Sequence, residues 1–396
     1  MDFWLILKII DWIIFAIVAI TVAYITFFSI AGLFSRHQDV PRSKRQNRFI
    51  ILVPSYKQDK IILNTVSSIL GQTYPQRMFD VIVISDHQSE VTNMRLAQYP
   101  ITLLTPNFEQ STKAKSLQYA ILNLPEFKIY DVAVILDASN LVEPEFLNQV
   151  NDAFEAAGTK AIQMHRLPQN RDTPSARLDS IFEEINNSIF RRGHIFVGLS
   201  AAMMGSGIAF DFNWFRDNIM KVRTASEDKE LEALLMRQHV YIDYFDDIHV
   251  YDEKTRDVKD FNRQRGRWAF SQLRGLISNI KYLPVALFNR HYDLVDKIIQ
   301  WMLLPRMIAT AIIAIVSLIM PFVYFSLAVK WWVLAAIMGL AFAIATPNNL
   351  VDHNWDKDFL TLPIRTILSI LKIDPERINL PKIHLPKFSF KKSLKK

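Results

Sequence analysis

Long apolar runs stand near both ends of the chain, and each is long enough to cross a lipid bilayer as a helix. The first run, residues 12–35, contains no charged residue. A helix rises about 1.5 Å per residue, so this run spans a hydrocarbon core of roughly 30 Å. A cleaved signal peptide has a shorter apolar region that ends in a small-residue cleavage site. We therefore predict an uncleaved membrane helix, preceded by Lys8 and Asp11 at a spacing that lets them pair near the interface.

Two further runs, residues 307–329 and 331–351, are separated by Lys330 alone. So short a connection predicts an antiparallel helical hairpin in the membrane. A buried core helix is the alternative for each run, above all for the last, whose end contains the sequence TPNN.

Short apolar runs of strand length, rich in valine and isoleucine, occupy the region between these spans. They cover residues 49–56, 80–86, 101–106, 132–138 and 159–164, and helical segments fall at 61–70, 114–122 and 144–157. Because the runs are continuous rather than alternating, they predict an α/β fold, a mostly parallel sheet with helices on both faces. In such sheets ligands bind beyond the carboxyl ends of the strands, so polar residues that close an apolar run are the first candidates for a site.

The distribution of charge orients the predicted spans. The chain has 46 Lys and Arg against 39 Asp and Glu, a net charge of +7. Basic residues follow the first run directly and crowd the C-terminus, and such basic flanks stay in the cytoplasm. One span, a cytoplasmic domain and two returning spans satisfy this rule, and residues 359–373 add an amphipathic helix of the interfacial type. The predicted units are a first membrane helix (1–35), a cytoplasmic domain (36–290), a region with two spans (291–351), and an interfacial helix with a basic tail (352–396).

Composition and absent motifs remove several classes of protein. Without cysteine the chain has no disulfide, no thiolate zinc site and no cysteine nucleophile. It contains no G-x-G-x-x-G after a strand, no P-loop motif and no H-E-x-x-H, which disfavours a dinucleotide oxidoreductase, a P-loop ATPase and a zincin. Few charged residues interrupt the spans, so a transporter is disfavoured as well. No nucleic-acid partner is expected.

Polar motifs punctuate the middle of the chain in a definite order. They are Pro54-Ser55-Tyr56, Asp86, Lys113, Asp137-Ala138-Ser139-Asn140, Gly205-Ser206-Gly207, Glu227-Asp228 and Gln264-x-x-Arg267-Trp268. This ordered set, with the span before it and the spans after it, resembles the membrane-integrated family-2 glycosyltransferases of the processive type, which include cellulose, chitin and hyaluronan synthases. The fully matched Q-x-x-R-W motif is its most specific element. The resemblance implies a GT-A-like nucleotide-sugar-binding domain joined to transmembrane and interfacial helices.

A nucleotide-sugar donor releases a diphosphate, and the negative charge that develops there needs a cation. Asp137, which ends an apolar run, is a candidate ligand for Mg²⁺ or Mn²⁺. An ordinary helix N-cap is the alternative reading of this residue, because a predicted helix follows. The family's D-x-D motif is D-A-S here, so the second carboxylate is missing, and Ser139 or Asn140 would supply a neutral oxygen instead.

The resemblance implies further donor-binding residues. Asp86 would bind the uracil or ribose of a UDP-sugar and Tyr56 would stack on the base, whereas the alternative for both is a simple turn residue. Lys113 would face the donor from the start of its helix. Arg267 would bind the diphosphate, since a guanidinium grips phosphate oxygens bidentately and keeps its proton.

Asp228 matches the aspartate of the family's E-D motif and would act as general base on the acceptor hydroxyl. A single displacement inverts configuration, so an α-linked donor gives a β-linked product. Compensation of a helix dipole is the alternative for this acidic pair, and a core tryptophan is the alternative for Trp268. The acceptor-binding residues implied by the resemblance are Gly205, Ser206, Gly207, Gln264 and Trp268.

These observations predict an inverting glycosyltransferase that moves a sugar from a UDP-sugar to a glycan acceptor at the cytoplasmic membrane face, with β-linked polysaccharide as the expected product. One alternative is a non-processive transferase acting on a lipid-linked acceptor. Another is a catalytically silent homologue that serves as a membrane scaffold, which Ser139 supports. Three spans are few for a polysaccharide channel, so a polymer would require a homo-oligomer, a channel completed by interfacial helices or a separate export partner. The geometric requirement is that Asp137, Asp228 and Trp268 converge on one pocket that opens toward the bilayer.

Overall fold

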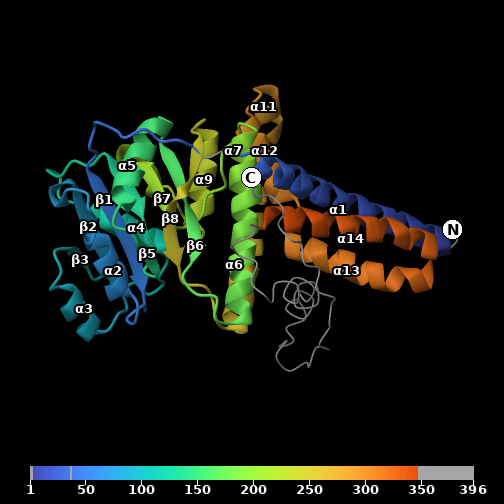
Figure 1. Cartoon of the computed structure of the whole chain (residues 1–396), viewed down its shortest axis with the longest axis horizontal. Coiled ribbons are helices and arrows are strands. Elements are labelled where there is room, and N and C mark those ends of the chain that lie inside the picture. Colours follow the sequence, from blue (N-terminus) through green and yellow to red (C-terminus); the bar gives the residue numbers. More distant parts are fainter. Residues whose placement is uncertain (1–2, 36–37, 347–396) are drawn as a thin grey trace, which may run out of the picture.

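The computed structural model describes residues 3–35 and 38–346, and the structural statements below refer to these residues. The chain consists of an α/β part and a bundle of three long apolar helices (Figure 1). Helix α6 (Pro174–Asn187) stands between the two parts and runs across the long axes of the apolar helices (Figure 1).

One sheet organises the α/β part. Its strands are β1 (Phe49–Tyr56), β2 (Phe79–Asp86), β3 (Thr102–Leu104), β4 (Val132–Ile135), β5 (Asn140–Val142), β6 (Ala161–Pro168), β7 (Ile208–Asp211) and β8 (Ile242–Asp252). Their order across the sheet is β3-β2-β1-β4-β7-β6-β8-β5. The pairs β3-β2, β2-β1, β1-β4 and β6-β8 are parallel, whereas β7 is antiparallel to both of its neighbours and β5 is antiparallel to β8. The prediction of a mostly parallel α/β sheet is confirmed.

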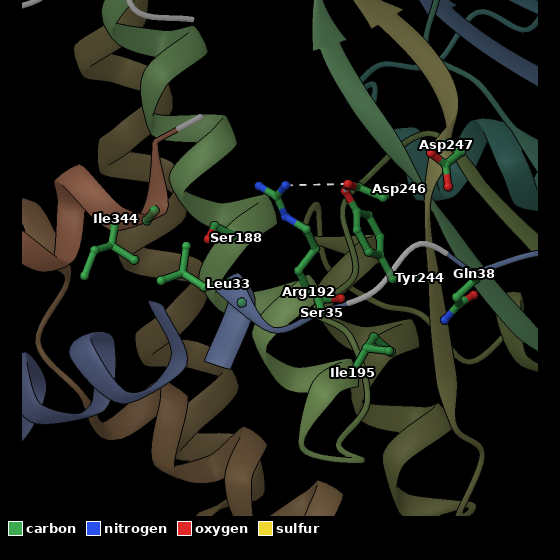
Figure 2. A pocket seen from close by; sticks show the side chains of 12 residues that line it. Leu33, Ser35, Gln38, Ser188, Arg192, Ile195, Tyr244, Asp246, Asp247 and Ile344 are labelled. Carbon is green, nitrogen blue, oxygen red and sulfur yellow. Dashed lines mark hydrogen bonds and ion pairs between the residues drawn. The ribbon is translucent and has the colours of Figure 1, made fainter. Parts of the chain in front are cut away.

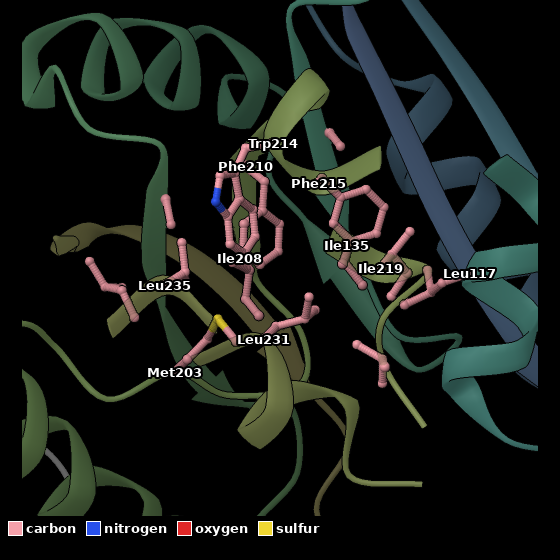
Figure 3. Packing of buried hydrophobic residues seen from close by; sticks show 14 of the residues in the cluster. Leu117, Ile135, Met203, Ile208, Phe210, Trp214, Phe215, Ile219, Leu231 and Leu235 are labelled. Carbon is pink, nitrogen blue, oxygen red and sulfur yellow. The ribbon is translucent and has the colours of Figure 1, made fainter. Parts of the chain in front are cut away.

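Helices cover both faces of the sheet, as the continuous apolar strands require. Ile50 and Leu52 of β1 face one apolar cluster, whereas Ile51 and Val53 face the other. The first cluster packs under α4 (Lys113–Leu122), α8 (Phe212–Ile219) and α9 (Glu227–Arg237), and the second under α2 (Ile62–Leu70) and α5 (Phe146–Ala157). Figure 3 shows part of the first cluster, which includes Leu117 of α4, Leu231 of α9 and the rings of Phe210 and Phe215.

The remaining helices are short or lie next to the apolar bundle. They are α3 (Glu90–Leu96), α7 (Gly193–Phe196), α10 (Val258–Asn279), α11 (Leu283–Phe288) and α12 (Tyr292–Met302), with a π-helical segment, η2 (Ser188–Arg192), between α6 and α7. Two single turns of 3-10 helix, η1 (Gln76–Met78) and η3 (Ile280–Tyr282), complete the chain order. Hydroxyl or carboxylate side chains at Ser89, Thr112, Thr173 and Asp211 accept an N–H from the first turns of α3, α4, α6 and α8, which sets where these helices begin.

The three apolar helices are α1 (Phe3–Leu33), α13 (Arg306–Val323) and α14 (Phe325–Ala345), and each is long and apolar enough to cross a membrane. Helices α13 and α14 form the predicted hairpin, but the connection lies at Tyr324 and not at Lys330, which is inside α14. Residues 347–351 of the third predicted run, the predicted interfacial helix 359–373 and the basic tail lie outside the described residues.

Charged residues near the free end of this bundle make contacts other than those predicted. Asp11 forms an ion pair with Lys330, and it accepts a hydrogen bond from the indole N–H of Trp331 at 2.8 Å. The ammonium of Lys8 lies instead over the ring of Tyr324, 4.6 Å from its centroid. The predicted pairing of Lys8 with Asp11 is therefore wrong, because the partner of Asp11 comes from α14.

We expect the substitution Asp11→Ala to destabilise the helical bundle, because it leaves the Lys330 ammonium without its partner. Removing one member of a buried pair costs about 3–5 kcal/mol. Thermal unfolding of the detergent-solubilised chain, followed by tryptophan fluorescence, should show a clearly lower midpoint for D11A than for wild type. Lys8→Ala is the matched control and should unfold near the wild-type temperature. Equal midpoints for D11A and wild type would contradict a stabilising pair.

Candidate active site

The carboxyl ends of β1 and β2 bring two predicted donor-binding residues together. Tyr56 and Asp86 are neighbours in the parallel register of these strands. Asp86 is 1% exposed, and its Oδ1 lies 2.5 Å from Nδ1 of His87, whose ring meets the ring of Tyr56 edge to face. The other oxygen, Oδ2, is buried and has no hydrogen-bond partner among the described residues. A buried acceptor of this kind needs a donor, which a bound ligand can supply.

Lys113 links three of the predicted motifs. Thr112 caps helix α4, so that Lys113 opens the helix at the edge of the sheet. Its ammonium forms an ion pair with Asp137, donates to the carbonyl of Gly205 at 2.7 Å and lies 3.8 Å from Oε1 of Glu227. Residues that are far apart along the chain therefore meet around one cation.

The D-A-S-N segment, which connects β4 to β5, is bound to a carboxylate that the sequence analysis did not assign. Ser139 Oγ and Asn140 Nδ2 both donate to Oδ1 of Asp252, at 3.2 and 3.0 Å. Oδ2 of Asp252 accepts from Arg166 and from Lys254. Burial would raise the pKa of Asp252, but Arg166 and Lys254 outweigh it and hold the pKa far below its usual value. Both oxygens of Asp252 are thus occupied by protein donors.

Helix α6 carries acids that bind the surrounding cations. Glu183 pairs with Lys254, and its Oε1 lies 3.5 Å from Nε of Arg166. Asp179 pairs with Arg265 at 2.5 Å. The sequence contains these acids in a helix with no recognisable motif, and their role becomes visible only from the contacts.

The Q-x-x-R-W motif lies on α10, and its two arginines face opposite ways. Arg265 is largely buried between the rings of Trp268 and Phe182, at 4.5 and 4.9 Å from their centroids. Arg267, the residue predicted to bind the diphosphate, is exposed. Trp268 is 38% exposed, and Gln264 Oε1 lies 3.5 Å from Oγ1 of Thr255. The motif therefore supplies one internal cation and one that faces solvent.

The G-S-G turn lies next to the Lys113 ammonium at Gly205 and against Val250 of β8 at Gly207. Gly207 has a φ of +66°, and a Cβ there would lie 3.3 Å from Val250, so that glycine suits both the conformation and the space. The amide of Gln163 donates to the carbonyls of Ser206 and Gly207 at 3.1 and 2.8 Å. Ser206 is buried, and its hydroxyl has no partner among the described residues.

Glu227 and Asp228 open helix α9 next to this turn. Glu227 is buried, and burial raises its pKa to about 7, with Lys113 opposing the shift and Asp228 adding to it. Asp228 is partly exposed, and its Oδ1 accepts the N–H of Lys229 at 2.8 Å. The hydroxyl of Ser226 lies 2.5 Å from that of Ser271, which is on α10 one turn after Arg267. This contact brings the Q-x-x-R-W helix next to the E-D pair.

Two cavities of the described residues lie away from these motifs. One, of about 340 Å³, is lined by the ends of α1 and α14 together with Arg192, Tyr244 and Asp246 (Figure 2). Another, of about 610 Å³, lies between α1 and the start of α12. Neither is lined by a predicted site residue, so the convergence of Asp137, Asp228 and Trp268 on one pocket stays a prediction.

The geometry can be compared with known proteins. The chain matches the family model described as glycosyl transferase family group 2 over residues 132–345, which is more than half of its length. It therefore belongs to that family, and it is a glycosyltransferase of the family-2 type. A comparison with curated protein sequences finds no match.

Two solved structures are examples of what this chain is similar to. The mannosyltransferase PcManGT from Pyrobaculum calidifontis, in complex with GDP-Man and Mn²⁺, is 12% identical, with a TM-score of 0.54 over 92% of this chain and 99% of that one. S. aureus TarS 1–349 in complex with UDP-GlcNAc is 13% identical, with a TM-score of 0.45 over 82% of this chain and 92% of that one. The first likeness shows that the α/β part has the GT-A-like fold.

Glu227 should make stability depend on pH. Its carboxyl binds a proton more tightly in the folded chain, with a pKa of about 7 against 4.5 in the unfolded chain. The contribution of this protonation to the free energy of unfolding is therefore fully present below pH 4.5, and it is lost as the pH rises toward 7.

We expect Glu227→Gln to unfold at a higher temperature than wild type at pH 8, with the difference shrinking toward pH 5. Melting temperatures of both chains across this range provide the measurement. Glu109→Gln, at an exposed position, is the control and should follow the wild-type curve. Parallel curves for E227Q and wild type would show that Glu227 titrates normally.

Proposed function

We propose that the chain is an inverting glycosyltransferase that transfers a sugar from a UDP-sugar to a glycan acceptor at the cytoplasmic face of a membrane. One observation carries the proposal: in a family-2 fold, Lys113 binds Asp137 and Gly205 and lies beside the Glu227-Asp228 pair. The donor, turn and base motifs therefore lie next to one another at the end of the sheet that follows the last residue of β4. PcManGT, which shares the fold, was solved with a nucleotide sugar.

The donor would lie along the ends of β1, β2 and β4. The unpartnered Oδ2 of Asp86 accepts a hydrogen bond from the uracil or ribose. Tyr56, 48% exposed, offers one ring face for stacking on the base. Lys113 provides a charge-assisted hydrogen bond to the diphosphate, and Arg267, exposed on α10, adds a second cation from the opposite side.

Asp228 would act as the general base. It is partly exposed and occupies the first turn of α9, where a carboxylate is stabilised by the helix dipole. It takes the proton from the acceptor hydroxyl as that oxygen attacks the anomeric carbon and the diphosphate leaves. One displacement on an α-linked donor yields a β-linked product.

Asp137 fits a divalent cation that is bound mainly through the donor. Mg²⁺ is commonly held by one or two carboxylates together with substrate phosphates and water. Asp137 is partly exposed, and its Oδ1 carries Lys113, whereas Asp252 has both oxygens occupied. The described residues contain no group of three or more acids and histidines that could hold an ion alone. A bound Mg²⁺ or Mn²⁺ would neutralise charge on the departing diphosphate.

The acceptor would lie against the G-S-G turn, Gln264 and the exposed face of Trp268 on α10. Membrane integration places α1, α13 and α14 across the bilayer as three spans, with residues 36–290 as the cytoplasmic domain and residues 291–351 and 352–396 as the second membrane region and its tail. Exposed apolar side chains on α10, α11 and α12, such as Phe270, Leu287 and Met302, would rest at the bilayer surface. Repeated addition gives a β-linked polysaccharide, and a single addition to a lipid-linked acceptor is the alternative.

A catalytically silent scaffold is the second candidate function, and the Ser139 contact favours it. The hydroxyl that replaces the second D-x-D carboxylate binds Asp252 rather than facing an open position. Under this proposal the chain would bind UDP without turning over any UDP-sugar.

Turnover distinguishes the two proposals. Purified full-length chain in detergent, given UDP-glucose, UDP-N-acetylglucosamine or UDP-glucuronate with Mn²⁺, should release UDP with at least one donor. Asp228→Asn should bind UDP as tightly as wild type, measured by calorimetry, and lose about 10²–10⁴-fold in transfer, since that is the usual contribution of a general base. Transfer by D228N at the wild-type rate would remove Asp228 from this role.

Metal binding should require nucleotide. We expect Mn²⁺ to raise the melting temperature of the wild-type chain only when UDP is present, because Asp137 alone is a weak ligand set. Ser139→Asp puts a second carboxylate beside Asp252, so Mn²⁺ should stabilise this variant without UDP. Chelation by EDTA should reverse each effect. Stabilisation of wild type by Mn²⁺ alone would show a complete ligand set that does not include the donor.

A further inference from the structure

Glu232, one helical turn after Asp228 on α9, is fully buried and has both carboxylate oxygens bound. Oε1 accepts the N–H of Met203 at 2.8 Å and the ammonium of Lys297 at 2.9 Å. Oε2 accepts the ammonium of Lys229 at 3.3 Å. Burial would raise the pKa of Glu232, but Lys229 and Lys297 outweigh it and hold the pKa at about 2. Glu232 is therefore a buried carboxylate anchor, which protein groups bind through both of its oxygens.

The anchor holds the start of the G-S-G turn. Met203 stands two residues before Gly205, and both of its backbone groups bind to α9: its N–H to Glu232 and its carbonyl to Lys229 at 3.2 Å. The next residue, Met204, donates its N–H to Gln163 at 2.8 Å. Helix α9, which carries Asp228 at its start, thus sets where the turn begins.

Lys297, which binds Glu232, connects this anchor to the apolar bundle. It lies on α12 and donates also to Gln300 at 2.9 Å. The amide of Gln300 donates to Asp296 at 2.7 Å, and the other oxygen of Asp296 accepts the hydroxyl of Tyr24 on α1 at 2.7 Å. A continuous polar chain therefore runs from a candidate membrane span to the turn.

We infer that Glu232 and Lys297 are positioning residues, which hold the acceptor turn and the Asp228 helix in one register relative to the membrane helices. This inference rests on the proposed transfer reaction. Neither residue has to touch donor or acceptor, since both are buried in contacts with protein. Their effect is on geometry: the sugar hydroxyl, bound at the turn, must reach Asp228 on the helix. A displacement of about 1 Å in such an arrangement costs about 10²-fold in rate.

Glu232→Gln tests the anchor because it keeps the shape of the side chain and removes its charge. With a donor that the wild-type chain turns over, E232Q should incorporate about 10²-fold less sugar into product. UDP affinity and hydrolysis of the donor by water should change no more than about twofold, so that the ratio of transfer to hydrolysis falls. A purely structural role would lower the two reactions together and leave this ratio unchanged, and that result overturns the proposal.

A double variant tests whether the charges of Glu232 and Lys297 act together. In E232Q the buried Lys297 ammonium loses its ion-pair partner, and Lys297→Met removes this ammonium. Glu232→Gln with Lys297→Met should therefore regain about tenfold in transfer over E232Q alone, an ordinary size for coupling between contacting residues. If the losses in transfer rate caused by Glu232→Gln and by Lys297→Met simply add in the double variant, the two charges do not act together. Glu155→Gln, on α5 and bonded to Asn47 and Arg45 among the residues that the structure describes, is the matched control and should behave as wild type.

Hydrogen–deuterium exchange gives a readout that needs no substrate. E232Q should exchange faster in the peptide that covers residues 203–207, because the Met203 N–H loses a charged acceptor, while peptides of β1 and β2 stay unchanged. Unchanged exchange in that peptide overturns the inference whether or not any donor is turned over. If E232Q exchanges faster but the wild-type chain releases no UDP, the anchor is supported and the proposed reaction is refuted.

Discussion

Three buried carboxylates on α6 decide how the α/β part meets the apolar helices. Asp179 binds Arg265 of α10, Glu183 binds Lys254 after β8 and faces Arg166 of β6, and Glu184 binds His165 of β6 and Arg192 of η2. A buried charge is costly unless it is paired, and removal of one partner is costly too. The cations come from four places, β6, η2, α10 and the segment after β8, so a shift of any of these elements against α6 would break at least one of the pairs. The same helix receives the guanidinium of Arg306, at the start of α13, on the carbonyl of Phe182 at 2.8 Å.

This network also accounts for the unusual D-A-S motif. Asp252, held by Arg166 and Lys254, places its other oxygen 3.2 Å from the hydroxyl of Ser139. An aspartate at position 139, which is half-buried, would set its carboxylate against that of Asp252. Without a bound cation this raises the pKa of one of the two carboxyls and destabilises the fold. Serine donates a hydrogen bond there instead. The missing carboxylate at position 139 therefore has a neighbouring carboxylate in its place. That carboxylate belongs to Asp252, at the end of β8, and not to the segment before β5.

The sequence predicted the elements whose apolar runs are continuous and missed those whose runs are not. Strands β1, β2, β3 and β6 agree in place with the runs at 49–56, 80–86, 101–106 and 159–164. Strand β8 carries four aspartates and bulges opposite Met164, so it lacks the apolar pattern that would reveal it. In the site, motif order identified Lys113, Asp137 and Gly205, which do meet. The buried partners Glu183 and Glu232 belong to no motif, and Asp252 opens the Asp252-Glu253-Lys254 segment, to which the sequence assigned no role. That Arg265 is buried and Arg267 exposed depends on which face α10 presents to α6.

Both halves of the candidate site are thus tied by buried carboxylates to helices that adjoin or belong to the apolar bundle. On the donor side the ties run from Ser139 through Asp252 and Lys254 to Glu183 on α6, and on the acceptor side from Met203 through Glu232 and Lys297 to α12 and α1. Because every oxygen in these carboxylate centres already has a protein partner or faces one, sliding the sheet against the bundle would break several charge-assisted bonds at once. Sheet and bundle therefore form one mechanical unit. The turn and the Glu227-Asp228 helix are thus positioned by contacts that continue to α12 and to α1, one of the candidate membrane spans.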